Sequence, residues 1–280
     1  MRPEGILIEV DGGPALLFER RYPQNIERVW KAVTDPGEMA QWFPSHVEGK
    51  RAEGAELAFV DDAQRAAAKE AGRPTRADGP IFRGSVIAFD PPNRFAFTWG
   101  GERLHFELTS DGDGTRLTFT HVLSHESVAA RNGAGWHVCL QALGRLLGVD
   151  EEETNPFAVY DDYVGRVGPS LGFSSGDGTM TWERATHVDA DRVRSAVTDH
   201  EQIEEWAGEK VDTEPLQWDI EPAEMGTLYR LTHADAANDP ELAASWHALL
   251  LQLDMYLAAG EPIPADSERF VERYTAILST

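Results

Sequence analysis

The residue with the clearest chemical potential is His121, which closes the segment Thr115 to His121. Strand alternation over this segment places Leu117, Phe119 and His121 on one face. We expect that face to be buried and His121 to point toward a helix that contains Trp136. An inward histidine can hold a polar ligand group or transfer a proton near neutral pH. The alternative is a core histidine whose ring nitrogens are satisfied by the backbone or by tryptophan.

Apolar and aromatic residues share faces on two segments before His121. They alternate with other residues in Phe95 to Trp99 and again in Leu104 to Leu108. A wall of this kind suits a sterol, an acyl chain or a polyaromatic ligand. The alternative is that the same side chains fill the core. The candidate ligand-binding residues are Trp42, Arg83, Phe97, Trp99, Phe106, Phe119, His121, Trp136 and Leu140.

Arg83 is the most polar of these candidates, and its orientation stays open. Arg83 and Ser85 alternate with Phe82 and Val86, so both faces of this segment contain an apolar residue. If the face with Arg83 is buried, its guanidinium requires an anionic or carbonyl partner.

Other clusters have simpler explanations. His121, His125 and Glu126 have a spacing that suggests zinc, but they lie across a strand end and not on a helix. Residues 111–114, with the sequence Asp-Gly-Asp-Gly, lack the later glutamate of a calcium loop and indicate a hairpin turn. The sequence has no phosphate-binding glycine loop after a strand and no nucleophile elbow. We therefore expect no metal, no cofactor and no catalytic set.

Composition limits the partners. The chain has 25 basic and 48 acidic residues and a formal net charge of −23, so nucleic acid and anionic bilayers are poor partners. No basic region followed by an apolar run begins the chain, and no apolar stretch is long enough for membrane insertion. The single cysteine, Cys139, excludes an intrachain disulfide and lies among apolar neighbours, which indicates an inert thiol. We expect a soluble cytoplasmic protein.

The elements that position these residues follow from hydrophobic periodicity and turn signals. A hairpin, an amphipathic helix and a short helical turn precede an antiparallel meander, and a long helix closes the first half. Residues 61–80 interrupt the meander as a surface excursion. The expected hairpin strands are 6–10 and 15–20; the helices are 26–33, 38–42 and 135–147; the later strands are 55–60, 81–89, 94–99, 103–109 and 115–121.

The second half repeats the first in shortened form. Glu27 to Asp35 and Asp191 to Asp199 are similar, and each is followed at the same spacing by a tryptophan, Trp42 or Trp206. About twenty residues separate Trp206 from Gly226, whereas about seventy separate Trp42 from Gly114. Twenty residues supply at most two short strands, so the second sheet cannot enclose a cavity by itself.

One substitution and one retained histidine bear on this second copy. Arg194 replaces the apolar Trp30, and His233 occupies the position of His121 where little room is left, which favours a structural role for the histidine. The expected organisation is a complete domain at 1–170, a linker rich in glycine and serine at 171–178, and a truncated repeat at 179–280.

The order of these motifs resembles a known family. Residues 15–165 resemble the activator of heat-shock protein 90 ATPase homologue-like family of the START-like (SRPBCC) superfamily, whereas residues 179–260 resemble it only at their two ends. The resemblance implies an α+β helix-grip fold, in which a curved antiparallel sheet surrounds a long C-terminal helix with an apolar cavity between them. The motifs that carry it are Phe18-Glu19-Arg20, Glu27 to Asp35, Trp42-Phe43-Pro44, Phe95-x-Phe97-Thr98-Trp99, Gly114-Thr115-x-Leu117-Thr118, Thr120-His121 and Gly135-Trp136.

Three functions remain open at this point. The leading hypothesis is a non-enzymatic protein that holds a hydrophobic small molecule (a lipid, a sterol-like or a polyaromatic compound) in the first domain, with the second domain as a lid or interaction module. The second is a polyketide aromatase/cyclase-like enzyme, which requires Arg83 or His121 to face a roomy cavity. The third is a chaperone co-factor or a dimerisation module, since exposed strand edges in the second domain favour pairing with another chain, including a homodimer.

Overall fold

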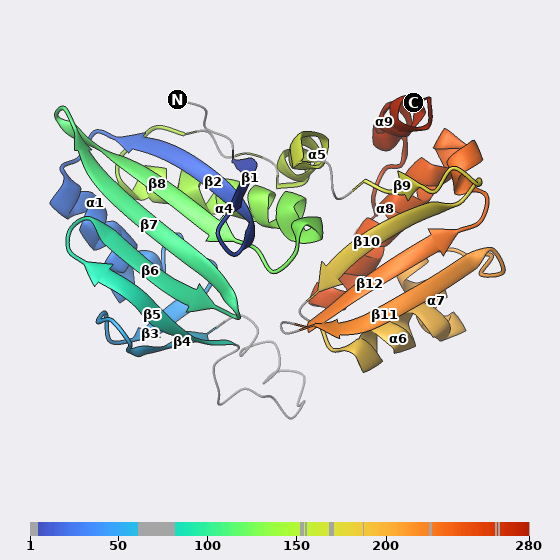
Figure 1. Cartoon of the computed structure of the whole chain (residues 1–280), viewed down its shortest axis with the longest axis horizontal. Coiled ribbons are helices and arrows are strands. Elements are labelled where there is room, and N and C mark those ends of the chain that lie inside the picture. The colour runs from blue at the N-terminus through green and yellow to red at the C-terminus, as the bar shows by residue number, and fades with distance from the viewer. Residues whose placement is uncertain are drawn as a thin grey trace. The chain divides into compact units, whose positions relative to one another are not determined.

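The computed structural model describes residues 5–60, 82–151, 154, 156–167, 171–186, 188–223, 226–260, 262 and 264–279 (Figure 1). The chain divides into two compact units, Met1–Arg166 and Val167–Thr280. The surface excursion expected at 61–80 lies outside the described residues.

An eight-stranded antiparallel sheet forms the centre of the first unit. Its strand order is β1-β2-β8-β7-β6-β5-β4-β3, so the meander from β3 to β8 is continuous and the first hairpin joins it at β8. The strands are β1 (Ile6–Val10), β2 (Gly13–Tyr22), β3 (His46–Gly49), β4 (Glu56–Val60), β5 (Phe82–Asp90), β6 (Arg94–Trp99), β7 (Glu102–Asp111) and β8 (Gly114–Val122).

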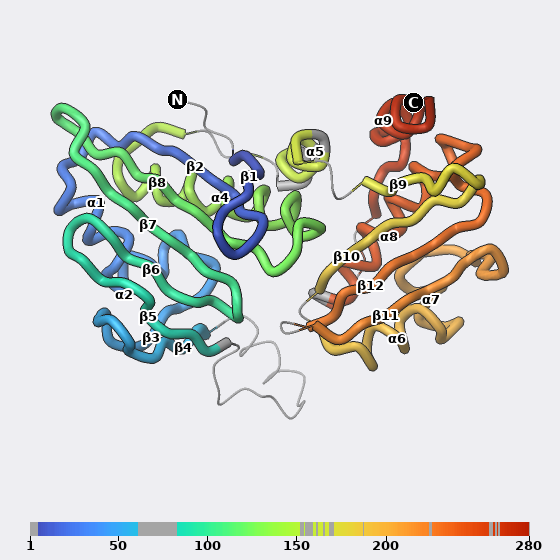
Figure 2. Tube along the Cα trace, in the orientation of Figure 1, coloured from blue at the N-terminus to red at the C-terminus, as the bar shows by residue number. Residues whose placement is uncertain are grey.

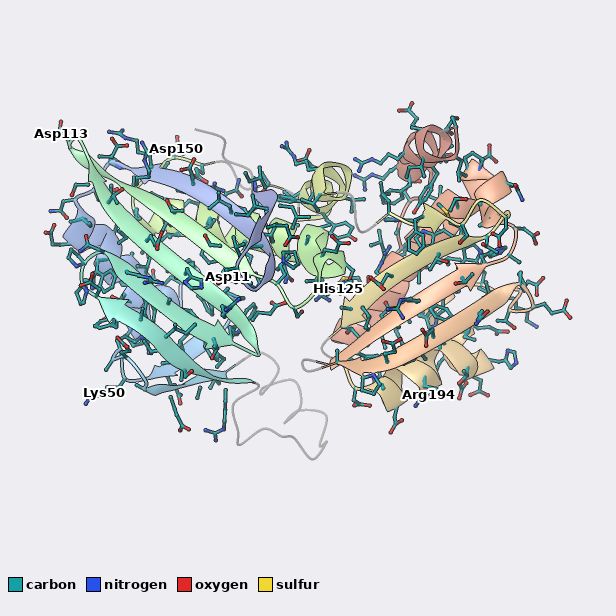
Figure 3. All side chains as sticks on the ribbon, in the orientation of Figure 1. Asp11, Lys50, Asp113, His125, Asp150 and Arg194 are labelled. Atoms are coloured by element: carbon teal, nitrogen blue, oxygen red, sulfur yellow. The ribbon has the colours of Figure 1, made fainter. Side chains whose placement is uncertain are left out.

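Turn chemistry explains how β7 and β8 meet. Gly112 has a φ of +64°, a conformation that glycine adopts without steric cost, and Asp111 lies opposite Gly114 in the register of the two strands. Asp113 marks the tip of this hairpin in Figure 3. The acidic segment is therefore a hairpin turn, as the missing glutamate ligand predicts.

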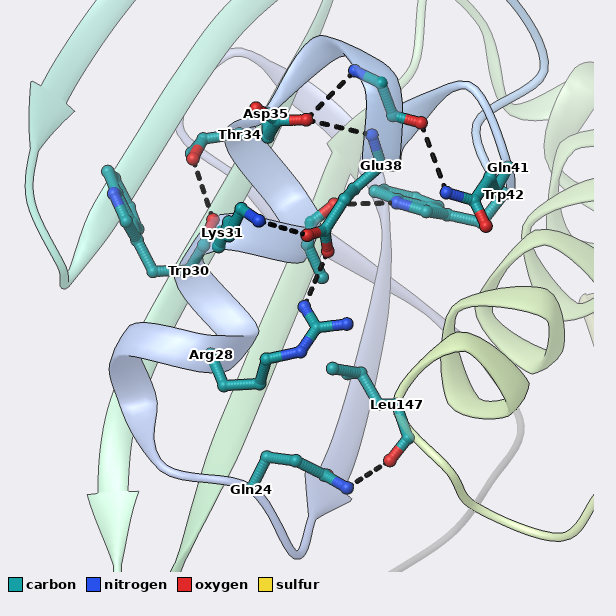
Figure 4. A network of polar contacts seen from close by, with 12 residues as sticks. Gln24, Arg28, Trp30, Lys31, Thr34, Asp35, Glu38, Gln41, Trp42 and Leu147 are labelled. Carbon is teal, nitrogen blue, oxygen red and sulfur yellow. Dashed lines mark hydrogen bonds and ion pairs between the residues drawn. The ribbon is translucent and has the colours of Figure 1, made fainter.

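Two capped helices follow the first hairpin. In α1 (Ile26–Thr34) the side chain of Asn25 accepts a hydrogen bond from the Arg28 amide, and Asp35 caps α2 (Pro36–Met39) in the same way. The carboxylate of Glu38 then ties the two helices together through ion pairs with Arg28 at 2.6 Å and Lys31 at 3.0 Å (Figure 4).

The long helix α4 (Ala129–Leu146) crosses behind the sheet and packs against β2. It begins six residues before the expected Gly135, directly after a short 3-10 turn at Glu126–Val128. Gly133 in the first half of this helix is explained by packing, because a β-carbon there would lie 2.5 Å from the ring of Tyr163. Tyr163 belongs to the helix α5 (Pro156–Val167), which ends the unit.

The second unit has a sheet of four antiparallel strands in the order β11-β12-β10-β9 (Figure 2). Phe173–Ser174 (β9), within the predicted linker, pairs with β10. The other strands are β10 (Met180–Thr186), β11 (Leu216–Ala223) and β12 (Gly226–His233). The helices are α6 (Ala190–Thr198), α7 (His200–Ala207), α8 (Pro240–Ala259) and α9 (Glu268–Leu278), and the side chain of Asp239 caps α8.

The two units share strand register as well as sequence motifs. Leu16 lies opposite His121 between β2 and β8, and Met180 lies opposite His233 between β10 and β12. β12 therefore corresponds to β8, and β11 corresponds to β7. Within the described residues of the second unit, no strands follow β11 in the places that β6, β5, β4 and β3 occupy in the first.

This architecture confirms the expected fold class. The protein is α+β, and its first unit has the curved antiparallel sheet and the long late helix of the helix-grip fold. The second unit keeps the strands nearest to its long helix.

Candidate functional site

Eight of the nine candidate residues lie in one cluster between the sheet of the first unit and α4. Phe97, Phe106 and Phe119 come from adjacent strands, and their rings stack at centroid distances of 6.0 and 4.6 Å. Trp136 of α4 closes over Phe119 at 4.6 Å. Leu140, one turn further along α4, has no exposed surface, as is also true of the three phenylalanines.

Trp42 joins this cluster from the opposite side. Its ring contacts Phe106 at 5.9 Å, and its Nε1 donates a hydrogen bond of 2.9 Å to the carbonyl of Ala32 (Figure 4). In the second unit, Nε1 of Trp206 makes the same bond to Ala196 at 2.9 Å. This repeated bond fixes the end of each short helix pair. Trp42 therefore stabilises the helix pair in addition to contacting Phe106.

His121 is completely buried, and both of its ring nitrogens have partners. The indole Nε1 of Trp136 lies 2.8 Å from Nδ1, and Oε2 of Glu102 lies 2.6 Å from Nε2. An indole can only donate, so Nδ1 must be the acceptor and the proton is on Nε2. His121 is therefore neutral and donates to Glu102.

Glu102 is the buried carboxylate that accepts this hydrogen bond from His121. Its other oxygen, Oε1, accepts hydrogen bonds from the amide of Ser124 at 2.9 Å and from the Ser124 hydroxyl at 2.7 Å. Burial would raise the pKa of Glu102, but the bonds from His121 and Ser124 outweigh it and lower the pKa to about 2. A carboxylate satisfied in this way joins the start of β7, the end of β8 and α4.

The sequence analysis did not single out Glu102. The signal was present, because alternation places Glu102 on the same face as Leu104 and Phe106, which are both completely buried. The double glycine before it indicates a turn, and a charged residue beside a turn is normally exposed. Only the approach of the end of β8 to the start of β7 supplies the three hydrogen bonds from His121 and Ser124 that make its burial tolerable.

Trp99 and Arg83 are the candidates that retain solvent exposure in the structure. Trp99 is partly exposed, and its ring contacts Trp136 at 5.8 Å and His121 at 6.1 Å. Arg83 lies on β5 opposite Ala58 and is exposed. The exposed Arg83 is therefore not a polar group of a buried cavity, which removes one of the two residues that a cyclase-like mechanism could use.

The second unit contains a different buried polar centre. The hydroxyl of Tyr274 accepts hydrogen bonds from the Gly172 amide at 3.0 Å and from the Trp182 indole at 2.6 Å, and it donates to Nδ1 of His247 at 2.9 Å. Burial lowers the pKa of His247 well below its ordinary value, with Arg184 acting in the same direction. His233, the counterpart of His121, accepts from the Asp235 amide at 3.1 Å.

The described residues also bear on metal binding and on membrane spanning. Among the described residues, no group of three or more histidine, cysteine or acidic side chains is arranged to hold a metal ion. No helix in the described part of the chain is both long and apolar enough to cross a bilayer.

Comparison with known proteins places the first unit. Residues 23–148 match the model of a family described as activator of Hsp90 ATPase homolog 1-like protein. Curated protein sequences provide no match to the chain.

Solved structures of similar fold come from several bacteria. CalU16 from Micromonospora echinospora is 21% identical, with 59% of this chain and 96% of that chain covered and a TM-score of 0.44. A protein from Bordetella parapertussis is 30% identical over 54% of this chain and 85% of its own, with a TM-score of 0.41. A conserved protein of unknown function from Enterococcus faecalis is 14% identical over 59% and 90%, with a TM-score of 0.45.

The family match covers the segment that holds α1, the meander and all of α4, which together form the site. Through its first unit, the chain belongs to the activator of Hsp90 ATPase homolog 1-like family of the START-like (SRPBCC) superfamily.

Proposed function

We propose that the first unit binds a hydrophobic small molecule without chemical turnover, and that the molecule enters beside Trp99. The family and the fold supply a scaffold for hydrophobic ligands. The site offers apolar rings, and its buried polar groups are already paired with one another. An apolar or polyaromatic ligand suits such a surface better than a charged one.

One observation carries the proposal. Trp99 is the member of the ring cluster that keeps exposed surface, and it rests on Trp136 of α4. The rings behind it contact one another, so a ligand must separate Trp99 from Trp136 to enter. Opening at this point would leave the Glu102 network in place, because Trp99 takes no part in its hydrogen bonds to His121 and Ser124.

The test uses a neutral probe, N-phenyl-1-naphthylamine, whose fluorescence rises in apolar surroundings. Trp99→Glu places a carboxylate at the entrance, and we expect it to weaken probe binding by at least about tenfold, or about 1.4 kcal/mol. Trp30→Glu is the matched control. Trp30 is also half-buried, but it packs on Phe89 at the other end of the cluster.

Circular dichroism establishes that both variants fold. Native mass spectrometry of the purified wild-type chain is the second measurement, and an apolar compound retained by wild type and lost from Trp99→Glu is the expected result. A folded Trp99→Glu variant that binds the probe as tightly as wild type would overturn the entrance at Trp99. Failure of wild type to bind any apolar probe would overturn the function itself.

A further inference from the structure

The second unit ends its sheet at β11, and no strand among the described residues pairs with the far edge of β11. The direction of the backbone groups follows from one hydrogen bond, in which the Ala234 amide donates to the carbonyl of Pro215 at 3.2 Å. Hydrogen-bonded pairs alternate along an antiparallel ladder. The N–H and C=O groups of Trp218 and Ile220 therefore face away from β12, toward the open edge.

The first unit shows what normally occupies such an edge. By register with β8 and β12, Phe106 of β7 corresponds to Trp218 of β11, and Leu108 corresponds to Ile220. In the first unit, the amide of Leu108 donates to the carbonyl of Asn93 at 2.7 Å, next to β6. The second unit thus retains the strand that receives β6, but none of its described residues forms a strand in the place of β6.

Side-chain burial agrees with this correspondence. Phe106 is completely buried and Leu108 is 1% exposed, and the ring of Phe97 on β6 stacks on Phe106 at 6.0 Å. Trp218 and Ile220 occupy the same face of β11 and are only half-buried. A strand added at this edge would remove apolar surface from water and satisfy backbone groups in the same step.

The acidic side chains on the outer face of β11 favour a partner with a basic side chain. Asp219 and Glu221 both pair with the guanidinium of Arg230 at 2.9 Å, and Glu183 pairs with it at 2.6 Å. One cation therefore serves three carboxylates. In the first unit, the residue that corresponds to Asp219 is Glu107, which faces Arg94 of β6 at 3.8 Å.

We propose that the open edge of β11 binds an extended segment of another protein, in which apolar residues alternate with basic or polar ones. The segment would lie on β11 as β6 lies on β7. Its apolar side chains would lie beside Trp218 and Leu216, as those of β6 lie opposite Phe106 and Leu104, and a basic side chain would face Asp219. This interaction surface is separate from the ring cluster of the first unit and does not depend on ligand binding there.

A second copy of the chain is a poorer occupant. Two β11 strands paired edge to edge would bring Asp219 and Glu221 of one copy close to the same residues of the other. Arg230 is already shared among three carboxylates, and like charges on neighbouring strands repel. The whole chain carries a net charge of −23, which adds to this repulsion.

The probe is a synthetic peptide with the sequence of residues 93–99, Asn-Arg-Phe-Ala-Phe-Thr-Trp, labelled with a fluorophore. We expect saturable binding to the full-length chain by fluorescence anisotropy. A peptide of the same composition with its two phenylalanines adjacent breaks the alternation and should bind at least about tenfold more weakly.

Two variants locate the site. Ile220→Pro removes an N–H that faces the open edge and leaves the bonds to β12 intact, so it should abolish peptide binding. Ile220→Val keeps that N–H and should retain binding. Hydrogen exchange on the wild-type chain makes the test independent of the folding of any variant, because the amides of Trp218 and Ile220 should gain protection only when the peptide is present.

Four outcomes would overturn the proposal. They are no saturable peptide binding, equal binding of the shuffled peptide, binding that survives in a folded Ile220→Pro variant, and unchanged exchange at Trp218 and Ile220. Sedimentation of the wild-type chain over a range of concentrations tests the second copy. A dimer that Ile220→Pro dissociates would assign the edge to self-association and overturn the proposal as well.

Discussion

The indole of Trp136 donates a hydrogen bond of 2.8 Å to Nδ1 of His121, and this bond determines the charge state of the imidazole. A doubly protonated ring could not accept it. His121 is therefore a neutral donor that holds Glu102 in place. Of the two roles that the sequence leaves open for His121, ligand binding and core structure, its hydrogen bonds favour core structure. The two residues connect α4 to β8 at the end of the ring cluster where Trp99 is partly exposed.

The first prediction concerns acid stability. Hydrogen bonds from His121 and Ser124 hold the pKa of Glu102 below its ordinary value, so its contribution to stability is complete above the ordinary pKa and is lost as the pH falls through the lowered pKa. Glu102→Gln should cost about 3 kcal/mol at pH 7, because the amide cannot accept from all the donors around it. Urea unfolding at pH 7 and pH 3 measures the change, and the gap from wild type should narrow at pH 3. An equal gap at both values would contradict the assignment.

The second prediction compares the two equivalent histidines. His121→Phe removes one donor from the buried Glu102 carboxylate, which keeps Ser124, and leaves the Trp136 indole without its acceptor. We therefore expect a loss of about 3 kcal/mol in the free energy of unfolding. His233→Phe removes a single acceptor, the one used by the Asp235 amide, and should cost about 1 kcal/mol. Chemical denaturation of both variants tests the order, and equal losses would argue against a special role for His121.

The third prediction concerns the two terminal tyrosines. The hydroxyl of Tyr274 serves Gly172, Trp182 and His247, so Tyr274→Phe should cost about 3 kcal/mol and should speed hydrogen exchange at the Gly172 amide. Tyr163→Phe is the matched change in the first unit, where the hydroxyl accepts from the Gly5 amide at 2.7 Å. We expect this variant to affect exchange at Gly5 and to leave exchange at Gly172 unchanged.

The fourth prediction uses two glycines in α4. A β-carbon at Gly135 would meet no atom within 4 Å, so Gly135→Ala should stabilise the protein by about 0.5 to 1 kcal/mol through helix propensity. A β-carbon at Gly133 would meet the Tyr163 ring at 2.5 Å, so Gly133→Ala should destabilise it. Thermal unfolding of the pair should shift in opposite directions. A destabilising Gly135→Ala would show that the exposed glycine has another task.

Local patterns in the sequence predicted most of the elements in the first unit. Alternation predicted β5 to β8, and turn chemistry predicted the hairpin at Gly112. The short strand β3 and the helix α9 were not predicted. β3 contains only four residues, too few for a clear alternation, and α9 follows Pro262 and Pro264 in a segment that matches no repeated motif.

The sequence alone determined the fold class, the repeated motifs and the inward faces of β6, β7 and β8, because these depend on periodicity and spacing along the chain. The tertiary structure decided what the inward groups do. Glu102 is tolerated in the core because His121, Ser124 and α4 meet around it, although they are distant in sequence. In the same way, the open edge at Trp218 and Ile220 became visible only in the strand order, since an unpaired edge is a relation between strands and not a property of either one.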